Sequence, residues 1–315
     1  MSGEKGLVVA LSGGIGGAKL ALGLYRILPP ESLVVVANTG DDFTHLGLHI
    51  SPDLDTLLYT LAGIDALETG WGRRGETWNF MAALESLGGQ SWFRLGDGDL
   101  ATHVERTRRL AAGESLGAIT AEFCRRLGVS ALLLPMSEDP VRTRLLTEDG
   151  WLDFQDYFVR QGTRPRVREI SYRGALKARP HPGFIEALSR PDLAAIVICP
   201  SNPFLSIDPI LSLPGVRAAL KAARAPVVAV SPIAGKRAFK GPTAKLMSEL
   251  GLEVAAESVL THYAGLFDHF LADEEDREEL SKFDANVSFA RIRMESLDDR
   301  ERIARLVLSL GQGSR

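Results

Sequence analysis

A strand, a glycine turn, a helix and a second strand follow one another near the start of the chain, and this pattern restricts the fold most. Residues 6–11, GLVVAL, form an apolar run that is too short for a helix and ends at glycines, as a buried strand does. A helical apolar pattern covers 18–28, and a second apolar run, SLVVVAN, covers 32–38. Such a unit requires a parallel strand pair with a right-handed crossover.

Similar apolar runs recur at 130–135, 193–200 and 225–232, each followed by polar loop residues and then a helical pattern. Continuous apolar strands of this type are buried on both faces of a sheet. The sequence therefore predicts an α/β fold with a Rossmann-like, doubly wound, mostly parallel sheet.

One segment breaks this alternation. Between about 142 and 175, mixed polar and apolar runs flank a turn signal at Asp149-Gly150, which is typical of antiparallel strands. We expect an antiparallel insertion there, a C-terminal helix over 296–315, and a single α/β domain over 1–315.

The composition excludes several classes of function. Hydrophobic residues make up 45% and charged residues 24% of the chain, as in ordinary globular proteins. The net charge of −4 and the absence of a dense basic run argue against nucleic acid as a partner. Without a leader or an apolar stretch of about 18 residues, the sequence predicts a cytoplasmic protein that does not enter a membrane.

Isolated basic and sulfur-containing residues are expected to be structural. The basic residues Arg106, Arg108 and Arg109 fit a solvated helix face. Cys124 and Cys199 are too far apart in sequence for a short-spaced metal pair, so we expect buried thiols in a reducing compartment.

The first glycine segment is a candidate phosphate site. Gly13, Gly14, Gly16 and Gly17 leave the backbone bare just before a helix, and Lys19 follows them. Backbone N–H groups at a helix N-terminus bind anionic oxygens, and Lys19 would add a positive charge. A tight strand-to-helix turn without a ligand has the same composition.

The known glycine-rich fingerprints do not match this segment. A dinucleotide site needs a third small residue, but Lys19 stands there, and Asn38 replaces the acid that would end the second strand. A P-loop needs a hydroxyl residue after its lysine, whereas Leu20 follows Lys19.

Aspartates follow the second strand and open the next helical segment. Asp41 and Asp42 come directly after the strand, and Asp53 and Asp55 stand at the helix start. Acids favour the first turn of a helix, but four of them near strand ends, where ligands bind in open α/β sheets, suit Mg²⁺ bridging to phosphate. We expect Asp42 and Asp55 to be metal ligands.

A second polar concentration lies at 92–103. Arg94 has the guanidinium geometry that binds a carboxylate or phosphate. Asp97 and Asp99 precede a helix that we expect to begin near Ala101, and Asp99 suits a helix cap as well as a site residue.

Two further loops follow later strands. Ser201 and Asn202 lie between two prolines, which makes a rigid polar loop. Lys240 and Gly241 precede a predicted helix N-terminus. Lys240 either binds a ligand there or is an ordinary surface charge. With the glycine segment, these loops favour an anionic ligand of nucleotide size.

Nine segments occur in order along the chain: SGGIGGAKL, NTGDD, SPDLDTLLYTLAG, RLGDGDLATH, LPMSEDPVRT, FQDYFVR, PSNPFLSIDPIL, VSPIAGKRAFKGPTAKLM and GLEVAAESV. Over roughly residues 7 to 270 this ordered set resembles one enzyme family, the 2-phospho-L-lactate transferases of coenzyme F-420 biosynthesis.

The resemblance implies a group transfer. Members take a guanosine-diphosphate-activated phospholactate, or its phosphoenolpyruvate counterpart, and join it to the ribityl hydroxyl of the deazaflavin alcohol Fo, releasing GMP. It implies Mg²⁺ as cofactor and a homodimer. By motif, Asp55 and Arg94 would contact Fo, while the glycine segment and the Ser201-Asn202 loop, with Lys19 or Lys240, would hold the nucleotide. Asp55 is also our candidate for the catalytic base.

Two alternatives belong to other classes. A related family of nucleotide-sugar-binding regulators shares a glycine loop and would bind without catalysis, but SPDLDT, RLGDGD and PSNPFLSIDPI count against it. A nicotinamide oxidoreductase is disfavoured by Lys19 and Asn38.

The roles assigned to Asp55 predict the behaviour of one variant. Asp55→Asn keeps the shape of the side chain but removes its charge, so transfer activity should be lost and Mg²⁺ affinity should fall. Steady-state kinetics and metal titration measure the two effects. Near wild-type activity and metal affinity together would contradict both roles.

Overall fold

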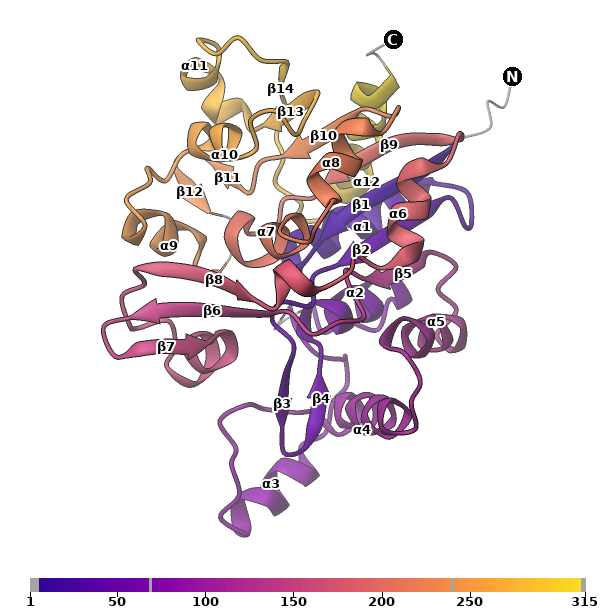
Figure 1. Ribbon diagram of the computed structural model, residues 1–315, viewed down its shortest axis with the longest axis vertical. Coiled ribbons are helices and arrows are strands. Elements are labelled where there is room, and N and C mark those ends of the chain that lie inside the picture. Colours follow the sequence, from indigo (N-terminus) through magenta and orange to yellow (C-terminus); the bar gives the residue numbers. More distant parts are fainter. Residues whose placement is uncertain (1–5, 68–69, 239–240, 313–315) are drawn as a thin grey trace.

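A seven-stranded sheet forms the centre of the protein. The computed structural model describes residues 6–67, 70–238 and 241–312 (Figure 1). The strand order is β14-β13-β10-β9-β1-β2-β5, and every neighbouring pair is parallel. The strands are β1 (Leu7–Ser12), β2 (Leu33–Ala37), β5 (Leu132–Pro135), β9 (Leu193–Ile198), β10 (Val227–Val230), β13 (His269–Ala272) and β14 (Val287–Phe289).

The order in which the strands are added confirms the predicted doubly wound fold. From β1 the chain adds β2 and β5 on one side, and later β9, β10, β13 and β14 on the other. The direction of winding therefore reverses between β1 and β9, and in open α/β sheets ligands bind beyond the strand ends at that point.

Helices cover both faces of the sheet because the strands are apolar on both faces. In β1, Leu7, Val9 and Leu11 belong to one core layer and Val8 and Ala10 to the other. The first layer includes α6 (Pro182–Ser189), α7 (Asp208–Leu211), α8 (Val216–Ala222) and α10 (Ala256–His262), and the second includes α1 (Gly14–Ile27), α2 (Pro52–Ala62), α5 (Leu116–Arg126) and α12 (Leu297–Gln312).

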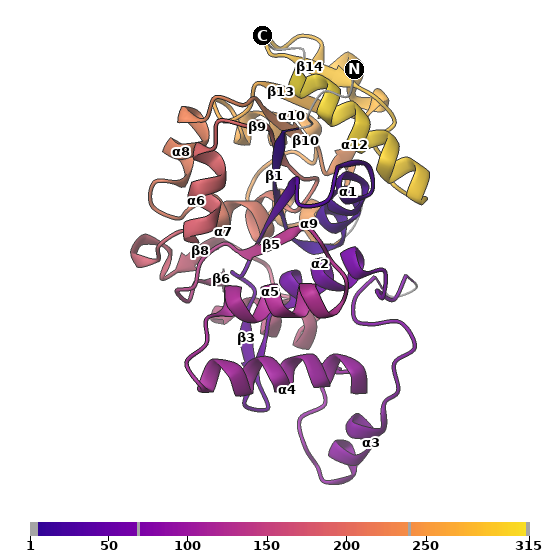
Figure 2. The same cartoon turned by 90° about the vertical axis from the view of Figure 1, so that its right-hand side faces the viewer.

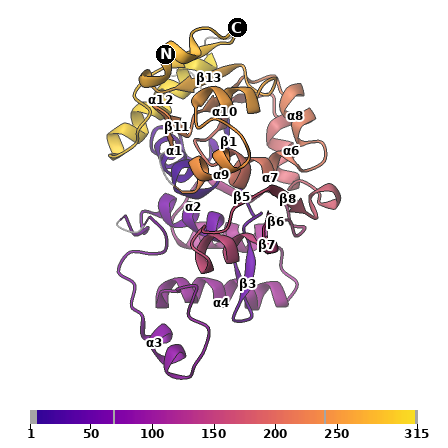
Figure 3. The same cartoon turned by 90° about the vertical axis from the view of Figure 1, so that its left-hand side faces the viewer.

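Two smaller units extend beyond the carboxyl end of the main sheet (Figures 1 and 3). Strands β6 (Arg142–Thr147), β7 (Gly150–Asp153) and β8 (Glu169–Arg173) form an antiparallel sheet in the order β7-β6-β8 within the predicted segment. The hairpin β3 (Phe43–His45) and β4 (Leu48–Ile50), with α3 (Asn79–Ser86) and α4 (Asp97–Ala111), forms the end of the molecule opposite the two termini (Figure 2).

Short elements complete the fold. They are the π-helical turns η1 (Asp156–Arg160) and η3 (Pro203–Ile207), the 3-10 turns η2 (Ala175–Lys177) and η4 (Glu274–Asp276), the hairpin β11 (Ile233–Ala234) and β12 (Arg237–Ala238), and the helices α9 (Thr243–Glu249) and α11 (Arg277–Leu280). None of the described helices is long and apolar enough to cross a membrane. Cys124 and Cys199 are buried free thiols, and burial raises the pKa of both to about 12.

Two helices begin earlier than predicted. Helix α1 starts at Gly14, so the glycines are its first turn and not a loop before it. They approach the Pro200-Ser201 loop so closely that a Cβ on Gly16 would overlap the Pro200 carbonyl oxygen. Helix α4 starts at Asp97 instead of near Ala101.

An external carboxylate explains the early start of α4. Glu76 accepts hydrogen bonds from the backbone N–H groups of Gly98 at 2.6 Å and Asp99 at 2.7 Å, which are donors that the helix itself leaves free.

Packing between α1 and α12 predicts an unusual response to a helix-favouring substitution. Gly23 lies in the middle of α1, and a Cβ there would overlap the carbonyl oxygen of Arg300. Helix propensity alone would make Gly23→Ala stabilising by up to about 1 kcal/mol. We expect the overlap to dominate and lower the free energy of unfolding by about 1–3 kcal/mol. Urea denaturation measures this, with Arg26→Ala on an exposed part of α1 as the control.

Candidate functional site

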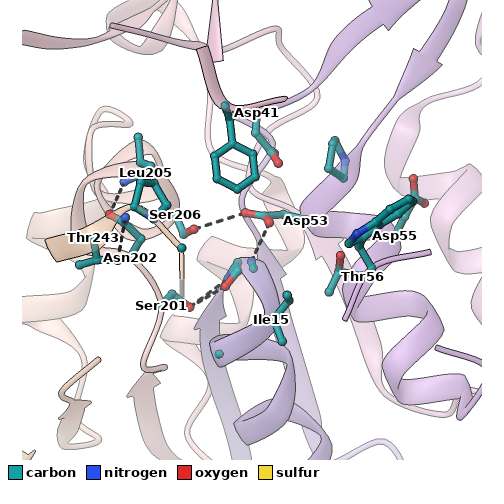
Figure 4. Close-up of a pocket in the computed structure, with 18 of the residues that line it drawn as sticks. Ile15, Asp41, Asp53, Asp55, Thr56, Ser201, Asn202, Leu205, Ser206 and Thr243 are labelled. Carbon is teal, nitrogen blue, oxygen red and sulfur yellow. Dashed lines mark hydrogen bonds between the residues drawn. The ribbon is translucent and has the colours of Figure 1, made fainter. Parts of the chain in front are cut away.

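A cavity of about 860 Å³ opens at the carboxyl edge of the sheet, at the predicted binding edge. Its walls come from the start of α1, the start of α2, the loops after β9 and β10, and the antiparallel unit. Figure 4 shows Asp53 near the middle, the Ser201-Asn202 loop on one side and Asp55 on the other.

Asp53 joins several segments at the centre of this cavity. Its carboxylate accepts hydrogen bonds from the Gly14 backbone N–H at 2.6 Å, the Asn38 side-chain amide at 2.9 Å and the Ser206 hydroxyl at 3.4 Å. Burial raises the pKa of Asp53 to about 6, although the hydrogen bonds from Asn38 and Gly14 oppose the shift.

Asp41 is a second buried acid beside it. The Asn38 amide nitrogen lies 3.4 Å from an Asp41 oxygen, so one amide group bridges the two carboxylates. Burial, and then repulsion by Asp53 and Asp42, raises the pKa of Asp41 well above its usual range. Simultaneous ionisation of both carboxyl groups is therefore disfavoured, and a cation bound between them would relieve this repulsion.

Asp42, one of the two predicted metal ligands, lies outside the cavity lining. Its Oδ2 accepts a hydrogen bond from the Ser51 hydroxyl at 2.9 Å and lies 3.1 Å from His49 Nε2. Its Oδ1 is buried without a hydrogen-bond partner in the described part of the chain.

Asp55, the other predicted ligand, lines the cavity but is already paired. Both of its oxygens accept from the guanidinium of Arg106, one of them at 3.0 Å. His103 Nδ1 lies 3.7 Å from Asp55 Oδ2. The expectation that Arg106 lies on a solvated face is wrong: its side chain is 1% exposed, because α4 turns it toward α2, while Arg108 is exposed as expected.

Several aromatic side chains line the cavity together with Arg94. The Arg94 guanidinium stacks over the Trp78 ring, with its central carbon 4.3 Å from the ring centre. The rings that line the cavity are Tyr59, Trp71, Trp92, Phe93, Phe154 and Phe158. Such a wall suits a planar ligand.

The predicted nucleotide loops are locked to each other. The Ser201 hydroxyl donates to the Gly13 carbonyl at 2.8 Å and accepts from the Gly13 N–H at 3.2 Å. Asn202 caps η3 by accepting from the backbone N–H of Phe204 at 3.0 Å, and its amide donates to Thr243 at 3.0 Å.

Lys19 and Lys240 are the two lysines that the sequence predicts to bind the nucleotide. Lys19 lines the cavity, and its ammonium group donates to the Met294 carbonyl at 2.8 Å. Lys240 lies outside the described residues.

Sequence reasoning missed several residues of this site. Asn38 directly follows β2 and counted only against a nicotinamide cofactor, although any polar residue at that strand end points to the site. Asp99 was left open as a helix cap or a site residue, whereas His103 and Arg106 were not assigned to the site. The three residues recur at a spacing that places them on one helical face, and that spacing was the available signal for the buried cluster.

The geometry limits how a metal ion is held. In residues 6–67, 70–238 and 241–312 no group of three or more His, Cys, Asp or Glu side chains is arranged to hold a metal. Mg²⁺ commonly uses one or two carboxylates together with substrate phosphates and water. The buried pair Asp41 and Asp53 fits that mode, whereas Asp55 would first have to leave Arg106.

Comparison with known proteins defines the class. The family described as 2-phospho-L-lactate transferase CofD matches residues 8–306. A phosphoenolpyruvate transferase of Streptomyces griseus is 40% identical over 97% of this chain and 98% of its own length. A 2-phospho-L-lactate transferase of Methanosarcina mazei is 38% identical over 96% of this chain and 99% of its own length.

A solved structure supports the doubly wound α/β fold described above. A crystal structure of a UPF0052-family protein from Bacillus halodurans superimposes with a TM-score of 0.66 at 16% identity, covering 98% of this chain and 100% of that one.

The chain belongs to the 2-phospho-L-lactate transferase family, which confirms the resemblance seen in its motifs. It is therefore a transferase by family.

The raised pKa of Asp53 predicts that this site opposes folding. A carboxyl whose pKa is about 6 in the folded protein and about 3.8 unfolded lowers stability as the pH rises from about 4 to 6. Asp53→Asn removes that penalty, so at pH 7.5 the free energy of unfolding should rise by at most about 3 kcal/mol.

Urea denaturation at several pH values measures the effect of Asp53→Asn. The gain should shrink as the pH falls toward 4, because wild-type Asp53 is then protonated. Asp298→Asn, which changes an exposed acid in the first turn of α12, is the matched control. A marked loss of stability in Asp53→Asn at pH 7.5 would contradict this account.

Proposed function

We propose that the protein transfers a phospholactyl or phosphoenolpyruvyl group from a guanosine-diphosphate-activated donor to the ribityl hydroxyl of the deazaflavin Fo, releasing GMP. One observation carries the proposal: a single cavity combines the N-terminus of α1 and a buried acid pair with an aromatic wall and further carboxylates. Family membership supports the reaction type.

The nucleotide is proposed to lie on the glycine side of the cavity. The first turn of α1 presents the backbone N–H groups of Ile15 to Gly17 and the positive end of the helix dipole to an anion, while the Gly14 N–H is already bound by Asp53. Lys19 adds positive charge. The bonds between Ser201 and Gly13 hold the loop after β9 against this turn, so the diphosphate meets a preorganised surface.

The acceptor is proposed to lie on the opposite side. Asp55, Asp99 and His103 line the cavity there, close to the aromatic wall. Carboxylates accept hydrogen bonds from hydroxyl groups, and aromatic faces pack against a planar ring. A polyol attached to a tricyclic ring has both features, which is the chemistry of Fo.

Mg²⁺ is proposed as the cofactor, held by Asp41 and Asp53 together with donor phosphate oxygens. When bound, it would neutralise charge that develops on the phosphoryl oxygens. The sequence predicted Asp42 and Asp55 as the metal ligands, and this remains a prediction. The ion pair between Arg106 and Asp55 does not favour metal binding by Asp55. Both oxygens of Asp55 already accept hydrogen bonds from Arg106, so the geometry favours binding of a hydroxyl group over the role of catalytic base.

The family resemblance further supports two proposals that concern the whole protein. We propose that it acts in the cytoplasm as a homodimer. Light scattering of the purified protein at micromolar concentration would test the dimer, since the predicted mass is twice 34.1 kDa.

A direct assay tests the proposed reaction. Purified protein, Fo and Mg²⁺ are mixed with each guanosine-activated donor, and GMP release is followed together with the mass of the product. We expect release with at least one donor, and loss of release with excess EDTA that added Mg²⁺ restores. The preferred donor distinguishes a lactyl from an enolpyruvyl transferase.

The nucleotide-sugar regulator gives the opposite pattern. Under that alternative, neither donor yields GMP, and a UDP-sugar raises the melting temperature while Fo does not. This result would overturn the proposed function.

A further inference from the structure

Arg106 is a buried cation to which the proposed reaction assigns no direct role. It lies on α4 with its side chain 1% exposed, and its guanidinium binds both oxygens of Asp55 on α2. One terminal nitrogen also lies 3.3 Å from His103 Nδ1. Arg106 itself is not among the cavity-lining residues, so it reaches the cavity only through its neighbours.

A second contact ties the same two helices. The Tyr59 hydroxyl on α2 donates to Asp99 Oδ1 on α4 at 2.8 Å. His103 lies between the two links, with its Nε2 at 3.2 Å from Asp99 Oδ2. These buried contacts set the position of α2 against α4 along one wall of the cavity.

The form of the Arg106 contact matters for Asp55. A guanidinium presents two parallel N–H donors to a carboxylate, which fixes both its orientation and its charge. Burying an ionised carboxylate without such a partner costs free energy, because the charge loses its contact with water. Asp55 is only 4% exposed. The two hydrogen bonds from Arg106 therefore determine which part of its carboxylate faces the cavity.

We propose that Arg106 is a positioning residue that sets the affinity for the acceptor, by holding Asp55 as a fixed and charged hydrogen-bond acceptor for a hydroxyl group. This inference rests on the proposed function, in which Asp55 contacts the deazaflavin alcohol. It assigns Arg106 an effect on the acceptor and none on the donor, because the Ser201-Asn202 loop lies on the other side of Asp53 from Asp55 (Figure 4).

A purely structural role would look different. If Arg106 only joined α4 to α2, its replacement would lower the melting temperature and leave the Michaelis constants of the folded enzyme unchanged. A positioning role changes the constant for one substrate selectively.

The first experiment compares Arg106→Lys, Arg106→Gln and the control Arg108→Gln. Arg108 is on the same helix but exposed, and its guanidinium bonds to the exposed Glu105. Lysine keeps the charge and loses the fork. We expect the KM for the acceptor to rise tenfold or more in Arg106→Lys and further in Arg106→Gln, with the donor KM within twofold and kcat reduced by a smaller factor. Arg108→Gln should match wild type.

A double-mutant cycle tests whether Arg106 acts through Asp55. Calorimetry gives the dissociation constant of the acceptor for wild type, Asp55→Asn, Arg106→Gln and the double variant. If Arg106 acts through Asp55, adding Arg106→Gln to Asp55→Asn weakens binding by less than twofold. If Arg106→Gln does not fold, the selective KM change in Arg106→Lys still distinguishes a positioning role of Arg106 from a purely structural one.

Two results would overturn the inference while leaving the proposed function intact. One is an acceptor KM within twofold of wild type in folded Arg106→Lys. The other is a double variant whose two effects multiply. Failure of the wild-type enzyme itself to release GMP with Fo would instead contradict the proposed function, so the two failures are distinguishable.

Discussion

The buried carboxylate of Asp53 is the contact on which the arrangement of the site depends. It binds the first N–H of α1 through Gly14, the end of β2 through Asn38 and the η3 turn through Ser206. Segments far apart in the sequence are therefore held at one point. Because its pKa is raised to about 6, this arrangement opposes folding at neutral pH, and the two apolar layers of the sheet must supply the compensating stability.

The topology of the sheet makes that meeting point possible. Since the winding reverses between β1 and β9, the loops that leave these neighbouring strands meet at the cavity. The Gly13 turn and the Ser201 loop are those two loops, and they are hydrogen-bonded. The second half of the cavity comes from α2, α4 and the antiparallel unit, which bring carboxylates and aromatic rings to the same opening.

Much of this could be predicted from sequence, because local patterns carry it. The strands at 7–12, 33–37 and 193–198 are continuous apolar runs, and such runs are buried in parallel sheets. The glycine segment and the loop at 201–202 follow strand ends and line the cavity. The early start of α1 was missed because its first N–H is satisfied by Asp53, a residue 39 positions away.

Pairing across helices was outside the reach of sequence patterns. Asp55 and Arg106 are 51 positions apart, and only the packing of α4 on α2 brings them together. The aromatic wall is also assembled from separate segments, since Trp92 and Phe158 come from different units. Isolated rings in loops have no periodicity that would have indicated a shared surface.

The central claim is that one cavity holds a nucleotide at the α1 turn and a deazaflavin alcohol at the aromatic wall. A crystal structure of the protein with GDP, Fo and Mg²⁺ tests it most directly. The account predicts phosphate oxygens on the N–H groups of Ile15 to Gly17, and the deazaflavin ring near Trp92 with its polyol on Asp55. A nucleotide that extends into the aromatic half and leaves no room for Fo would contradict it.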